Sequence, residues 1–418
     1  MIQVKHLSIA HKKDLRKIAN DVSFVLNNGD KAAMIGEEGN GKSTILKLIY
    51  DESLVDHYIE YEGEILKNQM VIGYLAQELS DDDKEKSVYE YLCSEPLFFD
   101  NHKKELAEIA SKLGIALELI YSEQKMKSLS GGEKVKIQFV RILCKRPNAF
   151  LLDEPSNDID IQTLEWLEKF IKECEFPVLY ISHDETLLEN TSNMIIHLEQ
   201  IKKKTQCKYT VERIGYREYT EKRKIGLDRQ KQLARKERSE HAKQMEKFQA
   251  IRQTVESQQN KISRQDPHGG KLLKKKMHAV KSLERRYEKE SAEMTEIPDT
   301  EEAIFFHFEE GGGIPNGKGV IDFHLDKLQM DKRVLANNIH LKIVGPKKVG
   351  IIGKNGVGKT TLLKIIADEL LDRTDIKAAY MPQNYEELLN LELSPIEYLT
   401  ETGEKEEHTR IRTYLGSM

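Results

Sequence analysis

Two glycine-rich stretches have the residue types and spacing that bind nucleotide phosphates. GEEGNGKST (36–44) and GKNGVGKTT (353–361) both fit the pattern GxxxxGK[ST]. In such a loop, backbone N–H groups surround a phosphate at a helix N-terminus, the lysine neutralises the β- and γ-phosphates, and the next hydroxyl holds Mg²⁺. The expected phosphate-binding residues are Gly36, Gly39, Asn40, Gly41, Lys42, Ser43, Thr44, Gly353, Asn355, Gly356, Gly358, Lys359, Thr360 and Thr361, with Ser43 and Thr360 as the metal-binding hydroxyls.

Polar residues at the ends of two apolar runs could supply the remaining chemistry of the first site. AFLLDEP (149–155) is a strand-like run that ends in two carboxylates. We expect Asp153 to bind Mg²⁺ and Glu154 to polarise an attacking water. His183 ends a second strand-like run and would reach the γ-phosphate. An acidic pair or a lone histidine is often only a surface feature, but the phosphate loop upstream favours the catalytic interpretation.

Two further motifs accompany the phosphate loops. Gln77 follows an apolar run after the first loop and could sense Mg²⁺ or water, and Gln383 is its counterpart after the second loop, also as a candidate metal ligand. SLSGGEKVKIQFVRIL (128–143) opens an amphipathic helix whose first turn can present N–H groups and a hydroxyl to a phosphate. The candidate residues of this motif are Ser130, Gly131, Gly132 and Glu133.

These motifs belong to an internal repeat. IGEEGNGKSTILKLI (35–49) matches IGKNGVGKTTLLKII (352–366), and each copy follows a strand-like run, KAAMI (31–35) or KKVGI (347–351). Two copies of one α/β domain explain this most simply. The expected organisation is a first domain over 1–205, a helical linker over 206–300, a loop over 301–317 and the beginning of a second domain over 318–418.

A basic helical segment separates the two copies. From 216 to 262 there is no proline and only one glycine, and good helix formers dominate. SRQDPHGG (263–270) breaks this helix, and a second helix is expected up to about Met294. Apolar stripes predict an antiparallel hairpin. The stripe residues are Met245, Phe248, Ile251, Val255 and Ile262 in the first helix and Leu273, Met277, Val280, Leu283 and Tyr287 in the second.

The charge of the chain is uneven. Residues 216–290 hold 22 Lys+Arg and 11 Asp+Glu, a net charge of +11, whereas the whole chain of 418 residues carries −5. The other 343 residues therefore carry −16. A basic segment in an acidic chain indicates contact with a polyanion, although a solvated charged helix is the simpler alternative.

Composition narrows the class of protein. Charged residues make up 32% of the chain, and no apolar run approaches the ~18 residues of a membrane-spanning helix. The N-terminus lacks the apolar core of a signal peptide. The four cysteines form no CxxC pair, so neither a zinc site nor a disulfide framework is expected. We therefore expect a protein of the reducing cytoplasm.

The order of the motifs resembles that of an ATP-binding cassette (ABC) ATPase. P-loop, glutamine loop, LSGGE signature, DE strand, SNDID loop (156–160) and switch His183 follow one another as in that family. The resemblance implies a P-loop NTPase fold with ATP and Mg²⁺ as cofactors. It also implies that two cassettes dock head to tail, so that each ATP lies between the P-loop of one cassette and the signature of the other.

Two cassettes joined by a basic hairpin, with no membrane span, resemble the ABC-F subfamily in particular. Its members bind the tRNA exit site of the ribosome and act as translation factors or as antibiotic-resistance proteins. The resemblance implies rRNA and P-site tRNA as partners of the hairpin tip, which holds seven Lys+Arg and one acidic residue over 261–281. The candidate RNA-binding residues are Lys261, Arg264, Lys271, Lys274, Lys275 and Lys276.

The second copy contains less of this pattern than the first. Only 65 residues follow the start of its P-loop, with no second signature, DE strand or switch histidine. We therefore expect a C-terminally truncated form of a two-cassette ATPase, with slow hydrolysis and apolar strand residues left without partners, namely Val349, Ile351 and Ile352. Head-to-tail association of two first cassettes could supply residual activity.

Three other functions compete with this interpretation. The ATPase subunit of a membrane transporter would share the cassettes but has no use for a long basic hairpin. A DNA-maintenance ATPase would join its cassettes by much longer coiled coils. A scaffold that binds ATP without hydrolysing it remains open for this form of the chain.

Overall fold

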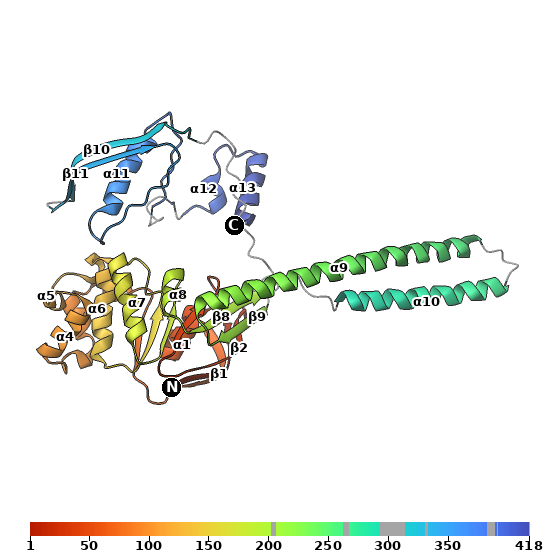
Figure 1. Cartoon of the computed structure of the whole chain (residues 1–418), viewed down its shortest axis with the longest axis horizontal. Helices are drawn as coiled ribbons and strands as arrows, with labels where there is room; N and C mark the ends of the chain where they lie inside the picture. The colour runs from red at the N-terminus through yellow and green to blue at the C-terminus, as the bar shows by residue number, and fades with distance from the viewer. Residues whose placement is uncertain are drawn as a thin grey trace.

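The computed structural model describes residues 1–201, 206–261, 267–292, 314–330, 333–382, 389–390 and 392–417. They form two α/β units and a helical arm that projects away from both (Figure 1). Within these ranges, no helix is both long enough and apolar enough to cross a bilayer.

A six-stranded sheet forms the centre of the first unit. Its order is β5-β6-β7-β3-β8-β9, with all neighbours parallel except the antiparallel pair β8 and β9. Because parallel strands end at the same edge, the residues that follow β3, β6 and β7 meet there. The strands span Lys31–Ile35 (β3), Ile72–Leu75 (β5), Ala149–Asp153 (β6), Val178–Ile181 (β7), Met194–Ile201 (β8) and Gln206–Glu212 (β9).

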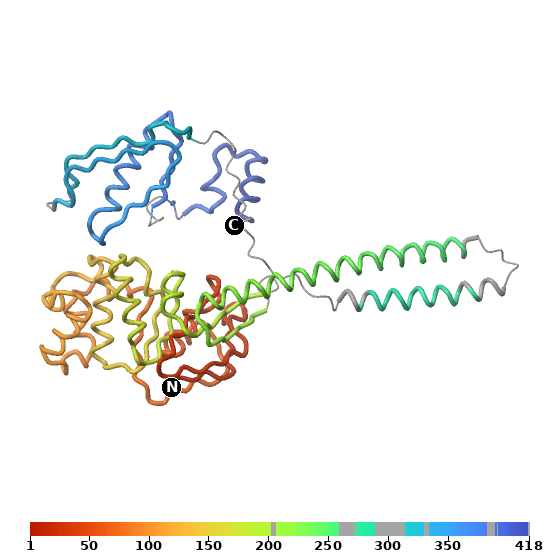
Figure 2. The backbone as a smooth tube through the Cα atoms, in the orientation of Figure 1, coloured from red at the N-terminus to blue at the C-terminus, as the bar shows by residue number. Residues whose placement is uncertain are grey.

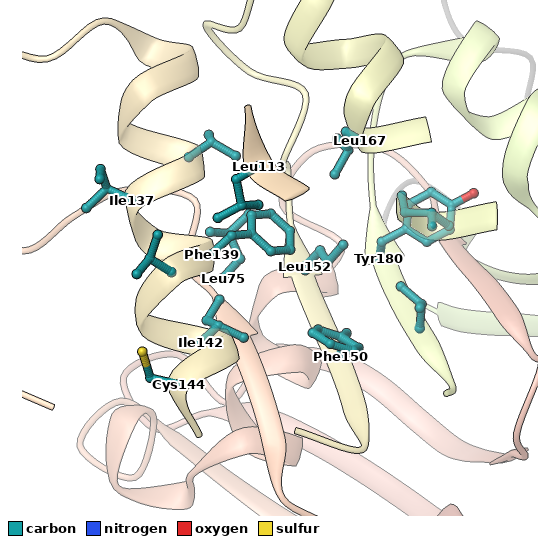
Figure 3. Close-up of a cluster of buried hydrophobic side chains, with 14 of the residues drawn as sticks. Leu75, Leu113, Ile137, Phe139, Ile142, Cys144, Phe150, Leu152, Leu167 and Tyr180 are labelled. Atoms are coloured by element: carbon teal, nitrogen blue, oxygen red, sulfur yellow. The ribbon is translucent and has the colours of Figure 1, made fainter. Parts of the chain in front are cut away.

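The central strands are buried on both faces, which explains their continuous apolar sequence. On β6, Phe150 and Leu152 point into one core and Leu151 into the other. Figure 3 shows the first core, where Phe139 of the helix Gly131–Cys144 (α6) packs beside Leu152. The ring centroid of Phe139 lies 5.1 Å from that of Trp166 in an edge-on arrangement. The sheet therefore fixes the positions of the polar residues that terminate its strands.

Helices and a second sheet cover the two faces. A three-stranded antiparallel sheet, β2-β1-β4, packs with α1 over one face, and helices α3 to α8 contribute residues to the other core. The strands are Ile2–His11 (β1), Lys17–Leu26 (β2) and Ile59–Leu66 (β4). The helices are Lys42–Tyr50 (α1), Asp81–Glu85 (α2), Val88–Cys93 (α3), Lys103–Leu113 (α4), Leu117–Ile120 (α5), Gly131–Cys144 (α6), Ile161–Glu173 (α7) and Glu185–Thr191 (α8).

The arm is an antiparallel helical hairpin. Helix α9 (Tyr216–Lys261) leaves the first unit and α10 (Pro267–Ala292) returns alongside it (Figure 2). At ~1.5 Å per residue, the 46 residues of α9 span about 69 Å. The seam contains Met245, Phe248, Val255, Met277, Val280, Leu283 and Tyr287, as the stripes predict.

The prediction of the stripe is wrong at Ile251, whose side chain is 49% exposed. Phe248, three residues before Ile251, and Val255, four residues after it, both pack in the seam, whereas Ile251 does not. Ile262 and the side chain of Leu273 lie outside the described residues. The break is also shorter than predicted, because α10 begins at Pro267 and includes the two glycines that follow.

The second unit contains a two-stranded sheet and three helices among its described residues. They are Gly319–Met330 (β10), Arg333–Val344 (β11), Lys359–Leu371 (α11), Pro395–Leu399 (α12) and Lys405–Ser417 (α13). The predicted strand at 347–351 does not form, because no described strand pairs with it and an extended segment needs a partner for its N–H and C=O groups. Val349, Ile351 and Ile352 are 50%, 39% and 79% exposed, as we expected for strand residues without partners.

The first unit is longer than the sequence predicted. Strand β9 pairs with β8 along seven residues, from Ile201 opposite Gln206 to Ile195 opposite Glu212. The unit therefore extends beyond the expected boundary at residue 205, to the start of α9.

Candidate functional site

The first phosphate loop connects β3 to α1 and is shaped by two glycines. Gly36 has φ 147°, and a Cβ there would lie 2.2 Å from the carbonyl oxygen of Leu198. Gly41 has φ 81°, and a Cβ there would lie 1.9 Å from a methyl carbon of Ile18. Neither position has room for a side chain, which is why the motif requires glycine there. Asn40 fastens the loop to β8, since its Nδ2 donates to Leu198 O at 3.1 Å.

Lys42 closes the loop from inside. Its Nζ donates to the carbonyl oxygens of Gly36 at 2.6 Å and Glu37 at 2.9 Å. Burial lowers the pKa of Lys42, against the opposing effect of Glu154, Glu38, Asp153 and Glu37. A partly desolvated ammonium group at the first turn of a helix is well placed to attract a phosphate.

The carboxylate of Asp153 lies at the end of β6 beside the loop hydroxyl. Ser43 Oγ donates to Asp153 Oδ1 at 2.8 Å. Asp153 is fully buried, and its Oδ2 has no hydrogen-bond partner among the described residues. Burial raises the pKa of this carboxyl group, although Ser43, Lys47 and Lys42 oppose the shift. A buried carboxylate oxygen without a partner, next to a hydroxyl, is the hard oxygen set that Mg²⁺ prefers.

Glu154 follows Asp153 and is paired with the predicted switch histidine. His183 Nε2 lies 3.2 Å from Glu154 Oε1, and Glu154 Oε2 is buried without a hydrogen-bond partner in the described part of the chain. The Glu154 backbone has φ 49°, unusual for a residue other than glycine, and its N–H donates to Ile181 O at 3.1 Å. Burial raises the pKa of Glu154 against the opposing charges of His183 and Lys42. A poised carboxylate of this kind suits a general base.

Other predicted residues of the first site have no contact with these groups that the structure describes. Gln77 is exposed after β5, Gly39 is exposed with φ 76°, and Thr44 is half-buried in the first turn of α1. The role of Gln77 therefore stays a prediction.

The signature motif forms the first turn of α6. Ser130 caps the helix and forms a capping box with Glu133, with Ser130 Oγ donating to Glu133 Oε2 at 2.7 Å. A Cβ on Gly131 would lie 1.8 Å from Asp158 O, and one on Gly132 would lie 2.6 Å from a side-chain oxygen of the following helix, α7. The two glycines therefore let the signature pack directly against the 156–160 loop.

The second phosphate loop shares with the first the position of its lysine and the conformation of its second and third glycines. Lys359 Nζ donates to Gly353 O at 2.8 Å and Lys354 O at 2.9 Å. Gly356 and Gly358 have φ 75° and 95°, matching Gly39 and Gly41. Thr360 is exposed and Thr361 half-buried, and the described residues bring no acidic strand end to Thr360. Gln383 lies outside the described residues.

The second phosphate loop contacts the first unit next to the signature. Asn355 N donates to Asp160 Oδ2 at 3.2 Å, and Asn355 Nδ2 donates to Asp158 O at 2.8 Å. Burial acts to raise the pKa of Asp160. Hydrogen bonds from Thr163 and Asn355 outweigh burial, so the pKa of Asp160 lies below its usual value. The second unit thus lies over the α6 and α7 end of the first (Figure 1).

Sequence reasoning missed the polar contacts at the base of the arm. His197 Nδ1 lies 2.7 Å from the hydroxyl of Tyr219 on α9, and its Nε2 lies 3.4 Å from Arg223 Nη1. Burial, then Arg223, lowers the pKa of His197 to about 3, so the ring is neutral. Because arginine only donates, Nε2 accepts and Nδ1 donates to Tyr219. A polar residue in the otherwise apolar run MIIHL (194–198) was the available signal.

Three of the six predicted RNA-binding residues are described together with their side chains. Lys274, Lys275 and Lys276 are exposed near the beginning of α10. Lys261 and Lys271 belong to helices, but their side chains lie outside the described residues, as does Arg264 entirely. These three consecutive lysines, called the lysine patch, lie in the first part of α10, at the end of the arm away from both units (Figure 1).

Comparison with known proteins finds similar sequences in ABC proteins. Residues 19–157 and 336–400 match the family model described as ABC transporter. The chain is similar to the probable ATP-binding protein YheS of Escherichia coli K12, with 24% identity covering 98% of this chain and 64% of that protein. It is also similar to ATP-binding cassette sub-family F member 2 of Bos taurus, with 27% identity covering 95% and 64%. The chain spans less than two thirds of the length of either relative.

The chain is also similar to one further relative and to a solved structure of an ABC transporter cassette. The uncharacterized ABC transporter ATP-binding protein YfmM of Bacillus subtilis is 27% identical, over 87% of this chain and 72% of that protein. Among solved structures, a dimeric bacterial ABC transporter cassette is 21% identical with a TM-score of 0.38, covering 48% of this chain and 94% of that one. Both phosphate loops lie inside the segments matched by the family model.

Proposed function

We propose that this chain, whose α/β fold is that of the ATP-binding cassette ATPases, is an ABC-F protein that acts on the ribosome. The observation that carries the proposal is the joining of two cassette phosphate loops by a basic hairpin, whose described lysine patch lies away from both loops. Relatives named for the F subfamily support it. The role is that of a cytoplasmic translation factor or an antibiotic-resistance protein.

The first site has the groups that ATP hydrolysis requires. Lys42 and the loop N–H groups would bind the β- and γ-phosphates, and Ser43 and Asp153 would hold Mg²⁺, which supplies charge neutralisation on the phosphates. Glu154 accepts the proton of the attacking water, and His183, 3.2 Å from Glu154 Oε1, orients that carboxylate. Because the described residues bring no equivalent of Asp153 and Glu154 to the second loop, we propose that hydrolysis takes place at the first site.

Nucleotide binding would set the position of the arm through pairing of the cassettes. Asn355 already connects the second loop to the 156–160 loop beside the signature. A nucleotide in the second loop would therefore lie near Ser130, whose hydroxyl would leave Glu133 to donate to a phosphate. Since α9 is fastened to β8 by Tyr219, movement of the first unit carries the arm with it.

The tip of the arm would contact ribosomal RNA and the P-site tRNA. Lys274, Lys275 and Lys276 are exposed, and exposed lysines bind phosphate groups with a strong dependence on salt. Lys261, Arg264 and Lys271 would extend the same patch. Shape and backbone charge, rather than base sequence, would dominate such recognition.

ATP-dependent co-sedimentation with ribosomes tests this proposal. The variant K274A/K275A/K276A should weaken ribosome binding about tenfold or more and leave ATP affinity unchanged. Each substitution removes one lysine that would contact a phosphate group of RNA. The matched control is K103A/K104A/K112A, which removes three exposed lysines from α4 of the first unit. Normal ribosome binding by the first variant, or an equal loss in the control, would contradict the role of the tip.

The alternative is the ATPase subunit of a membrane transporter. The description of the matching family model favours it. It assigns no role to the arm, so deletion of the arm tip would leave transporter function intact. Binding to a membrane partner instead of ribosomes in the same sedimentation experiment would favour this alternative.

A further inference from the structure

The two phosphate loops agree at every glycine of the motif but differ in charge at two successive positions. Glu37 and Glu38 of the first loop correspond to Lys354 and Asn355 of the second. These positions carry two negative charges in the first loop and one positive charge in the second. Glu37, Glu38 and Lys354 are exposed, so the difference is presented to whatever approaches each loop.

The surface that receives the second loop presents two acceptors to Asn355. Asn355 donates twice, to Asp158 O at 2.8 Å and to Asp160 Oδ2 at 3.2 Å. Asp160 is fixed in this position because it caps α7 and accepts from Thr163 N at 2.9 Å. The Asp158 carbonyl is fixed as well, since that residue has φ 58° and its oxygen lies against Gly131.

The first loop keeps a backbone N–H at this position but cannot make the side-chain contact. A glutamate at the position of Asn355 has no donor for Asp158 O, and it would place a carboxylate beside the charged carboxylate of Asp160. Like charges brought together at an interface repel each other, and this repulsion suppresses pairing with the wrong partner. Glu37 adds a second negative charge where the second loop has Lys354.

We propose that the 156–160 loop selects between the two phosphate loops. It accepts the Lys354–Asn355 loop of the second unit and rejects the Glu37–Glu38 loop, so that first units do not pair with one another. By the same chemistry, any surface that closes over the first phosphate loop has to bring hydrogen-bond donors or positive charge to Glu38. This inference concerns pairing alone and does not depend on the role at the ribosome.

Sedimentation equilibrium of the full chain without nucleotide tests the selection. N355E puts a carboxylate on both loops, and this variant should stay monomeric. E37K/E38N/N355E, called the exchanged chain, exchanges the asparagine and the glutamate between the two loops and adds a lysine to the first. It should self-associate at least about tenfold more tightly than N355E, a factor that corresponds to about 1.4 kcal/mol. The matched control is E60K/E62N/N355E, with the same charge change at exposed positions of β4.

Two further measurements sharpen the test. Amide hydrogen exchange in 156–163 should become faster in N355E, and by a smaller factor in K354E, which keeps both donors of Asn355. The difference in association between the exchanged chain and N355E should shrink as salt rises from 50 to 500 mM, because the Debye length falls well below ~10 Å. Association of the exchanged chain no tighter than the control, or unchanged exchange in N355E, would overturn the proposal.

Discussion

The same phosphate loop occurs twice in this chain in very different settings. In the first unit, Met34 of β3 is fully buried between β7 and β8. Its counterpart in the second unit, Ile351, is 39% exposed and lies in no strand. Yet Lys42 and Lys359 each donate to two loop carbonyl oxygens, at 2.6 to 2.9 Å.

This difference shows which features of the site are local. The loop needs a helix start, glycines with positive φ and a lysine that folds back onto the carbonyls, all within nine residues. A strand needs partners from elsewhere in the chain, because its N–H and C=O groups are otherwise unpaired. The carboxylates proposed for metal binding and catalysis are equally non-local, since Asp153 reaches Ser43 only because β6 lies in the same sheet as β3.

The largest expected effect is on ATP hydrolysis, which we assign to the first site. Hydrolysis at the second loop would contradict the contrast drawn between the two sites. Glu154→Gln removes the general base and should lower ATP turnover by about 10² to 10⁴-fold, while ATP affinity changes little. Phosphate release measures turnover, and equilibrium dialysis measures binding. The matched control is Glu165→Gln on the exposed side of α7. Turnover that survives in the Glu154 variant would move the chemistry to another group.

The second prediction sharpens the contrast between the two strand positions. Met34→Ala should lower the free energy of unfolding of the first unit by about 2 to 5 kcal/mol, because it leaves a cavity in a packed core. Ile351→Ala, at the matching position, should cost less than about 1 kcal/mol. Amide hydrogen exchange reports each unit separately. Equal costs at the two positions would show that the second segment is buried in solution.

Local patterns were sufficient to predict much of this molecule from its sequence. The apolar run 149–153 became a buried strand, and the serine at 130 became a helix cap, because both depend on a few neighbouring residues. The hairpin seam followed from helical spacing, apart from Ile251. The sequence placed Glu154 and His183 in one site, but it did not predict their 3.2 Å contact, which arises because the parallel strands β6 and β7 end at the same edge.

What the sequence could not predict depends on long-range partners. The segment 347–351 has a strand-like composition and still forms no strand, because the backbone pairing it needs comes from other strands. The contact from Asn355 to Asp160 joins residues 195 positions apart, and no local pattern signals it. The neutral His197 that holds Tyr219 depends in the same way on the docking of α9.

The smallest expected effect is on the pH dependence of stability and distinguishes the first site from the second. Burial raises the pKa of both Asp153 and Glu154. Between their usual pKa of about 4 and the raised values, the folded state binds more protons than the unfolded state. The contribution of these groups to the free energy of unfolding therefore falls as pH rises through that window.

Glu154→Gln removes one of these two groups and should make the fall shallower. At neutral pH the variant should be more stable than the wild type by about 1 kcal/mol, since it replaces a buried carboxylate with an unpaired Oε2 by an uncharged amide. Urea unfolding from pH 4 to 8 can be followed by the fluorescence of Trp166, the single tryptophan of the chain, which lies in the first unit. Taking the difference between variant and wild type cancels the titration of all other groups. If the free energies of unfolding of the variant and the wild type change with pH in parallel, Glu154 is not desolvated. The proposed activation of this carboxylate by burial would then be wrong.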